Sequence, residues 1–282
     1  RMPLIKTKKE LQVQLSLAKQ KGSLGLVPTM GALHQGHVSL VVQADSENTT
    51  TVVTIFVNPT QFDNQEDLDK YPSTLKADMK LLEKISKKII VFAPKASEIY
   101  GNEMKSKRYN FGGLDKVMEG AFRDGHFEGV GTIVEKLLNL VLPDRVYFGE
   151  KDFQQLQIIK KLVAIRNIPV EIIGCPIVRE STGLAMSSRN ERLSSSLREE
   201  AAFIYKTLRS AKKEFGMKSA KSVTDWVEDQ FEQHTDLKLE YFTITDIEKL
   251  RPAQRKRRNT KYRAFIAVYA KDVRLIDNIA LN

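Results

Sequence analysis

The chain of 282 residues contains one cysteine, one tryptophan and four histidines, and these scarcities narrow the possible functions. A single cysteine, Cys175, excludes both an intrachain disulfide framework and a metal site built from several thiolates. Because Cys175 lies in the apolar stretch "EIIGCP", we expect a buried and unreactive thiol. No apolar run approaches the roughly 20 residues that cross a bilayer. With a polar N-terminus that has no signal-peptide core, these features predict a cytoplasmic protein without a membrane segment.

Lysine and arginine outnumber aspartate and glutamate, and the formal net charge is +10. Part of the excess lies in "RPAQRKRRNTKYR" (251–263), which has no acid at all. This segment could be a nucleic-acid patch or a solvated loop that joins two strands. We favour the loop, because no aromatic platform or RNA-binding signature accompanies it. A general positive bias would also suit an anionic substrate such as a nucleotide.

The order of apolar segments predicts a Rossmann-like α/β fold, a parallel sheet with helices on both faces. Helical patterns alternate with continuous apolar runs that are typical of buried parallel strands. We expect helices at 7–20, 37–46, 73–87, 130–142 and 152–166, with Thr7 as the first N-cap. We expect strands at 24–27, 51–57, 88–93, 145–149 and 170–175.

The pattern changes after residue 176, where two helical segments precede two strand-like segments. The helices follow candidate caps at Ser196 and at Ser219 or Ser222. The strands "KLEYFTITD" and "YRAFIAVYA" are expected to pair antiparallel. We therefore predict a nucleotide-binding domain at 1–176 and a smaller α+β domain at 177–282.

Polar residues gather where the predicted parallel strands end, which is where open α/β sheets bind ligands. The segment "PTMGALHQGH" (28–37) follows the first of these strands and holds two of the four histidines. Gly31 and Gly36 would let the backbone approach a ligand, and a helix starting near His37 would offer N–H groups to phosphate. His34 and His37 could donate hydrogen bonds to the same phosphate. A zinc site is less favoured, because neither a third ligand nor a neighbouring glutamate follows.

Three further segments carry groups that suit an anionic or hydroxylated substrate. Lys151 in "GEKD" follows a strand, although the spacing is not that of a P-loop. The segment "MSSRN" is either an anion grip or a helix N-cap with a surface arginine. Gln61 and Gln155 follow strands and could bind a hydroxyl or a carboxylate. His126, between glycines, could cap a helix or line the site, and His234 is expected at the surface.

Five ordered motifs resemble those of the pantothenate synthetase (pantoate–β-alanine ligase) family, within the nucleotidyltransferases related to class I aminoacyl-tRNA synthetases. They are "PTMGALHQGH", "FVNPTQF", "RDGHFEGV", "YFGEKDFQQL" and "GLAMSSRN", and the likeness continues to "RLIDNI" near the C-terminus. The resemblance implies that pantoate is activated by ATP as pantoyl adenylate with release of pyrophosphate. The amine of β-alanine then displaces AMP and forms pantothenate.

The resemblance also implies roles for individual residues. Catalytic contacts with the phosphates would come from His34, His37, Lys151 and Arg189. Gln61 and Gln155 would bind pantoate, Gln61 also lying near β-alanine, and Asp78 would meet Mg²⁺. The second domain would act as a lid. The implied ATP-binding set is Met30, Gly31, Ala32, Leu33, His34, Gln35, Gly36, His37, Gly149, Glu150, Lys151, Asp152, Val178, Met186, Ser187, Ser188 and Arg189.

Two other functions are compatible with parts of this pattern. One is another nucleotidyltransferase of the same fold, which would give no reason for the paired glutamines. The other is an RNA-binding module, suggested by the positive charge and the synthetase-like signature, whose affinity would fall steeply with salt. We favour the ligase, and we expect small-molecule substrates, no nucleic acid, no membrane and a homodimer.

Overall fold

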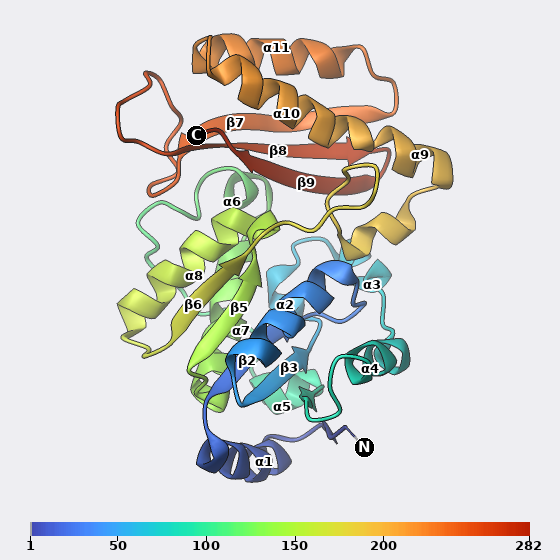
Figure 1. The fold of residues 1–282 in the computed structure, drawn as a ribbon, viewed down its shortest axis with the longest axis vertical. Coiled ribbons are helices and arrows are strands. Elements are labelled where there is room, and N and C mark those ends of the chain that lie inside the picture. Colours follow the sequence, from blue (N-terminus) through green and yellow to red (C-terminus); the bar gives the residue numbers. More distant parts are fainter. Residues whose placement is uncertain (1) are drawn as a thin grey trace. The chain divides into compact units, whose positions relative to one another are not determined.

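The computed structural model describes residues 2–282, which divide into two compact units (Figure 1). The first unit comprises the chain up to Asp115 together with Glu119–Pro176. The second comprises Ile177–Asn282 and also takes in the short segment Lys116–Met118. Each unit has its own sheet and is described by itself.

The first unit is built on a sheet whose strand pairs are all parallel. In residues 2–282 this sheet has six strands in the order β1-β4-β3-β2-β5-β6. The expected strands are present, and β1 adds an edge strand of two residues that is too short to leave a periodic signal. The strands are β1 (Leu4–Ile5), β2 (Leu24–Thr29), β3 (Thr50–Ile55), β4 (Ile90–Phe92), β5 (Arg145–Gly149) and β6 (Glu171–Cys175).

Helices cover both faces of this sheet, which confirms the predicted fold class. Val27 and Val53 pack on one face with Leu40 and Val41 of α2 (Gln35–Glu47). The preceding residue of β2, Leu26, is fully buried and points to the opposite face, because side chains alternate along a strand. There α7 (His126–Val141) contacts β2, and α1 (Lys8–Lys21) contacts α7.

The remaining helical elements of the first unit connect or flank the strands. Thr7 caps α1 by accepting a hydrogen bond from the N–H of Glu10, as predicted. The other elements are η1 (Pro59–Gln61), α3 (Gln65–Lys70), α4 (Leu75–Glu83), α5 (Ala96–Tyr100), α6 (Glu119–Phe122), η2 (Glu150–Asp152) and α8 (Phe153–Arg166). The predicted inert cysteine is confirmed, since Cys175 is buried at the end of β6 and burial raises the pKa of its thiol to about 11. Within residues 2–282, none of the helices has the length and apolar character that crossing a membrane requires.

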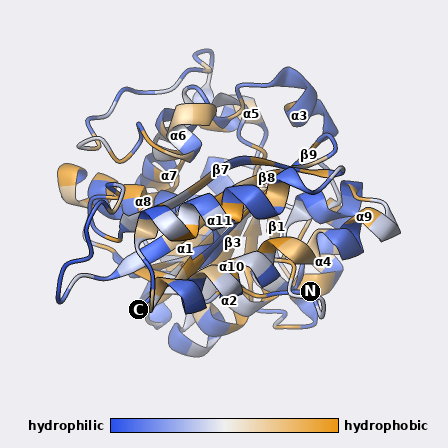
Figure 2. Cartoon of the chain, turned by 90° about the horizontal axis from the view of Figure 1, so that it is seen from above, coloured by the Kyte–Doolittle hydropathy of each residue, from blue (hydrophilic) through white to orange (hydrophobic). Residues whose placement is uncertain are grey.

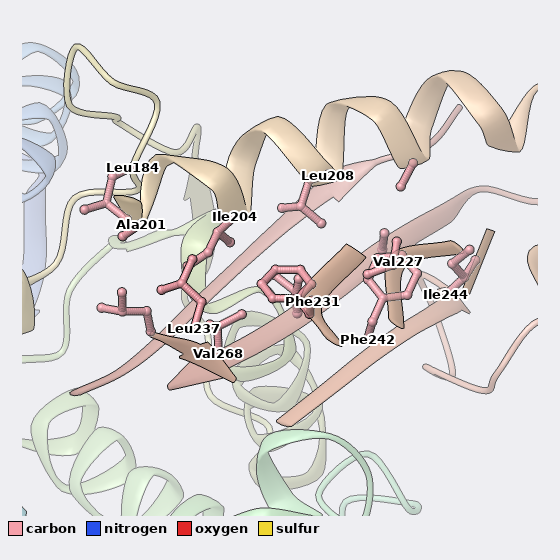
Figure 3. Close-up of a cluster of buried hydrophobic side chains, with 14 of the residues drawn as sticks. Leu184, Ala201, Ile204, Leu208, Val227, Phe231, Leu237, Phe242, Ile244 and Val268 are labelled. Carbon is pink, nitrogen blue, oxygen red and sulfur yellow. The ribbon is translucent and has the colours of Figure 1, made fainter. Parts of the chain in front are cut away.

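The second unit packs helices against an antiparallel sheet in the order β7-β8-β9. The predicted antiparallel pair is confirmed as β7 (Leu237–Asp246) and β8 (Tyr262–Ala270), and β9 (Val273–Ala280) was not anticipated. Its core lies between the sheet and α10, where Ile204 and Leu208 meet Phe242 and Val268 (Figure 3). The helices are η3 (Ser188–Arg192), α9 (Ser195–Glu200), α10 (Ala202–Phe215) and α11 (Ala220–Glu232).

The helix boundaries of the second unit follow serine caps. Ser194, rather than the expected Ser196, accepts from the N–H of Leu197 and starts α9. Ser219 caps α11, as one of the two candidates proposed. Residues of α11 are coloured both hydrophilic and hydrophobic in Figure 2, which fits a helix with one buried stripe. His234, expected at the surface, is partly buried, and its ring centroid lies 4.3 Å from that of Phe203.

A buried ion pair ties the start of the second unit to its sheet. The guanidinium of Arg179 donates to both carboxylate oxygens of Asp277 on β9, at 2.6 and 3.0 Å. The guanidinium also lies over the ring of Tyr205, 3.6 Å from its centroid. Because only 17% of the Arg179 side chain and 3% of the Asp277 side chain are exposed, solvent screens this pair little.

Replacing Asp277 by alanine is expected to destabilise the protein by about 3–5 kcal/mol, because it leaves the Arg179 charge buried without its partner. Urea denaturation followed by circular dichroism measures this loss. Asp225→Ala is the control, since Asp225 pairs with Lys221 on the exposed surface of α11 and its removal should leave the midpoint unchanged. Equal midpoints for the two variants would contradict the prediction.

Candidate active site

The site expected from the sequence lies at the carboxyl edge of the first unit's sheet. Strand β2 pairs in parallel with β3 on one side and with β5 on the other. The segments that follow these three strands therefore emerge at one edge. They are Met30–His34 after β2, the η1 segment after β3 and the η2 segment after β5.

His34 and His37 face each other at the start of α2, with ring centroids 4.0 Å apart. Helix α2 begins at Gln35, two residues earlier than predicted, because His34 itself is the N-cap. Nδ1 of His34 accepts from the N–H of Gly36 at 3.0 Å, and Nδ1 of His37 accepts from the N–H of His34 at 3.2 Å. An Nδ1 atom that accepts carries no proton, so each neutral ring carries its hydrogen on Nε2.

Lys151 lies close enough to His37 to change its protonation. Burial lowers the pKa of His37 to about 3, and the charges of His34 and Lys151 act in the same direction. The ring of His37 is therefore neutral at physiological pH, so it can donate a hydrogen bond from Nε2 but holds no proton to release. This proximity brings together three of the four residues predicted to contact phosphate.

The lowered pKa of His37 predicts how stability depends on pH. Because the unfolded side chain titrates near 6.5 and the folded one near 3, the unfolded state binds more protons between these values. Stability from this residue is complete above the unfolded pKa and is lost as pH falls toward the folded pKa. The Tm of the wild type minus that of His37→Gln is expected to shrink between about pH 7 and pH 4. A difference that stays constant over this range in calorimetry would contradict the assignment.

The backbone amides of the loop before α2 are held by protein side chains. Thr29 Oγ1 accepts from the N–H of Gly31 at 3.1 Å, and it also donates to the carbonyl of Thr54. The next two amides bind Asp78, and those of His34 and Gly36 bind imidazoles. The sequence pattern suggested that glycines and amides would cradle phosphate here. Several of these amides are already bound to side chains, and phosphate contact by this segment stays a prediction.

Asp78 lies in the first turn of α4 and is only 2% exposed. Its Oδ2 accepts from the N–H of Ala32, and its Oδ1 accepts from the N–H of Leu33, both at 3.0 Å. Oδ1 also accepts from the hydroxyl of Thr74 at 3.1 Å. Both oxygens are therefore already engaged by protein groups, and the predicted magnesium contact of Asp78 stays a prediction. Across residues 2–282, no three His, Cys, Asp or Glu side chains group as a metal site.

Gln61 is the last residue of η1, and its side chain is oriented by Asn58. The sequence alone did not identify Asn58 as a candidate site residue. Nδ2 of Asn58 donates to the carbonyl of Gly129 at 3.1 Å and to Oε1 of Gln61 at 3.0 Å. Oδ1 of Asn58 accepts from the hydroxyls of Tyr100 and Thr60 at 2.5 and 3.1 Å. Since a carbonyl can only accept, this chain fixes the amide of Asn58 and then that of Gln61. Nε2 is therefore the end of Gln61 that can donate to a substrate.

Helix α7 packs directly against the backbone of Gln61. Nδ1 of His126, the first residue of α7, donates to the carbonyl of Gln61 at 2.9 Å. A Cβ on Gly129 would come within 2.5 Å of the carbonyl oxygen of Thr60 and within 2.6 Å of Cα of Gln61. Gly129 and Gly131 therefore serve close packing. Two roles were left open for His126, capping the helix or lining the site. Gly125 rather than His126 is the N-cap of α7, and the ring of His126 instead holds the backbone of Gln61.

The third segment combines η2 with the first turn of α8. Gln154 points inward, where it accepts from the N–H of Glu119 and donates to the carbonyl of Leu114. The adjacent Gln155 is partly exposed, whereas Gln61, the other candidate ligand of pantoate, is buried with 9% of its surface exposed. Gly149, Glu150, Lys151 and Asp152 are all partly exposed at the end of β5.

The remaining candidates, Val178 and Met186–Arg189, belong to the second unit. Residues 178–186 form a hairpin in which the N–H of Met186 donates to the carbonyl of Val178 at 2.9 Å. Ser187 caps η3 by accepting from the N–H of Arg189 at 3.2 Å. The cap suggested by the sequence is therefore present, and an anion-binding role for these residues stays a prediction.

Comparisons with known proteins converge on one family. The model of the family described as pantoate-beta-alanine ligase matches residues 3–280. The pantothenate synthetase of Christiangramia forsetii is 56% identical over 276 residues, which cover 97% of this chain and 98% of that protein. The pantothenate synthetase of Bacteroides fragilis is 49% identical over 279 residues, with 99% and 98% covered.

Solved structures give the same result. The crystal structure of pantothenate synthetase from Thermus thermophilus aligns with a TM-score of 0.92 at 37% identity and covers 99% of each chain. The pantoate-beta-alanine ligase of Francisella tularensis, complexed with beta-gamma ATP and beta-alanine, aligns with a TM-score of 0.78 at 34% identity. That alignment covers 100% of this chain and 98% of the Francisella chain.

Proposed function

The chain belongs to the pantoate–β-alanine ligase family, and from this premise we propose how its residues carry out the ATP-dependent synthesis of pantothenate. The observation that carries the proposal is the cluster of His34, His37 and Lys151 at the carboxyl edge of the sheet. Two imidazoles that can donate from Nε2, of which that of His37 is neutral, lie beside one ammonium group and match the charge that develops on a triphosphate during transfer.

The reaction proceeds in two displacements. A carboxylate oxygen of pantoate attacks the α-phosphorus of ATP, and the bond between that phosphorus and the oxygen bridging to the β-phosphate breaks. Pyrophosphate leaves with the electron pair. The amine nitrogen of β-alanine then attacks the acyl carbon, AMP departs as the leaving group, and the nitrogen loses its proton. Neither imidazole has to deliver a proton in the first step, so their contribution is electrostatic.

Gln61 and Gln155 are assigned to pantoate. The fixed Nε2 of Gln61 suits an acceptor on the substrate, such as its carboxylate or a hydroxyl oxygen. This polarity favours a carboxylate substrate over an ammonium one at that position. The beta-alanine present in the Francisella complex supports a site for the second substrate in this family. The family resemblance supports assigning Val178 and Met186–Arg189 to ATP and a lid role to the second unit.

The other partner assignments rest on the resemblance alone. We propose a cytoplasmic homodimer that acts on small molecules without nucleic acid, and light scattering tests the dimer. Magnesium would accompany the nucleotide through its phosphates, which are its usual ligands in ATP-using enzymes. Whether Asp78 also meets this ion stays a prediction, since its two oxygens already accept hydrogen bonds from the protein.

Isotope exchange tests the proposal directly. The protein is incubated with ATP, magnesium and labelled pyrophosphate, with or without pantoate and in the absence of β-alanine. The expected result is exchange of label into ATP only when pantoate is present, followed by AMP formation once β-alanine is added. Formation of ADP, or exchange that does not need pantoate, would reject the adenylate route. Retention on RNA that falls steeply with salt, without any turnover, would favour the RNA-binding alternative.

A further inference from the structure

We infer that Asp78 is a positioning residue, whose carboxylate holds a left-handed turn and thereby places the two histidines. The inference rests on the proposed roles of His34 and His37. It adds a function to a residue that touches neither ring. Asp78 lies on α4, whereas the histidines lie at the start of α2.

The turn between β2 and α2 has an unusual backbone. Gly31 and Ala32 follow one another with φ of +79° and +50°. The second of these is a non-glycine residue in the left-handed region, which an alanine rarely adopts without compensation. Strain of this kind persists where the surroundings hold it in place, and it gathers at functional sites.

Asp78 supplies that compensation. Its two oxygens accept from the consecutive N–H groups of Ala32 and Leu33, at 3.0 Å each. Successive N–H groups in a turn of this kind form a concave surface that suits a carboxylate. A Cβ on Gly31 would approach Oδ2 of Asp78 to 3.2 Å and Cγ2 of Ile55 to 3.0 Å, so the turn fits closely against its anchor.

The position of the histidine pair follows from this turn. Leu33 is followed directly by His34, which caps α2, and the N–H of His34 donates to the ring of His37. A rotation of the backbone at Ala32 would therefore move the cap, the first turn of α2 and both rings together. Misplacement of reacting groups by about 1 Å lowers rates about 100-fold.

Asp78→Asn tests the inference while preserving the size of the side chain. Its amide nitrogen must face one of the two N–H groups, so the turn loses half of its anchor. We expect pantoate-dependent exchange to fall by about 100-fold, with the magnesium concentration for half-maximal rate unchanged. Adding Ala32→Gly should recover roughly tenfold, because glycine adopts the left-handed conformation without the anchor. Asp229→Asn, on the exposed surface of α11, is the matched control and should retain the wild-type rate.

The outcomes separate this inference from its rivals. If half-maximal rate in Asp78→Asn requires much more magnesium and excess magnesium restores the rate, Asp78 is a metal ligand and the inference fails. If exchange stays at the wild-type level while the Tm falls, the role is structural only and the inference also fails. Absence of recovery with Ala32→Gly contradicts it as well, provided that the thermal melt shows the double variant folded at the assay temperature. If wild-type protein shows no pantoate-dependent exchange, the proposed function fails instead.

Discussion

Pantoate-dependent pyrophosphate exchange is expected to fall by about 10²–10³-fold in either His37→Ala or Lys151→Ala. Each change removes a donor or a charge that strengthens its interaction as negative charge builds on the separating phosphates. The neutral state of His37 makes it a donor of fixed polarity, and Lys151 contributes a full charge at the same place. The loss should appear mainly in the exchange rate at saturating ATP, since the contacts strengthen in the transition state.

Matched variants distinguish this loss from damage to the fold. His37→Gln keeps an acceptor for the N–H of His34, because glutamine at this position of a helix completes a capping box. Its Tm should therefore stay closer to that of the wild type than that of His37→Ala. Lys160→Ala, on the exposed side of α8, and His234→Ala, in the second unit, should retain wild-type exchange. Wild-type rates in both His37→Ala and Lys151→Ala would overturn the roles proposed for them.

The periodicity of apolar residues predicted the fold. The polar residues that follow the strands predicted the edge of the sheet where the histidines lie. Continuous apolar runs identified the long strands, because a strand that is buried on both faces needs apolar side chains at nearly every position. The two-residue β1 could not be found in this way. Strand β9 escaped because its polar Asp277 and Asn278 interrupt the apolar pattern, and both are buried in the structure by tertiary contacts.

The orientation of polar groups could not be obtained from sequence. The histidine pair suggested phosphate contact, but which ring nitrogen carries hydrogen follows from the backbone amides that bind Nδ1. Asp78 was associated with magnesium, and nothing in the sequence indicated that it also binds two backbone amides that lie 45 and 46 residues away in the chain. Asn58 stands in the quoted "NPTQF" segment, yet its importance depends on a carbonyl of α7. A local pattern contains no signal for such distant partners.

Asn58→Asp is expected to lower kcat/KM for pantoate by about 10²-fold or more, although the two side chains have nearly the same shape. The new carboxylate has no N–H to offer, so it repels the carbonyl of Gly129 and Oε1 of Gln61. The amide of Gln61 then turns over to donate to residue 58. It presents an oxygen, rather than Nε2, to a substrate that carries a negative charge.

Comparison with Asn58→Ala makes this prediction sharp. Alanine leaves the Gln61 amide without a preferred orientation, so the substrate can still select the productive one, and the loss should be smaller than in Asn58→Asp. A purely structural role predicts the opposite order, because aspartate preserves packing and alanine opens a cavity. Exchange kinetics with varied pantoate, with Asn259→Asp in the exposed 251–263 loop as control, decide between the two orders. Lower pH should partly restore Asn58→Asp but not Asn58→Ala, since a protonated carboxyl regains one donor and can again satisfy Gln61.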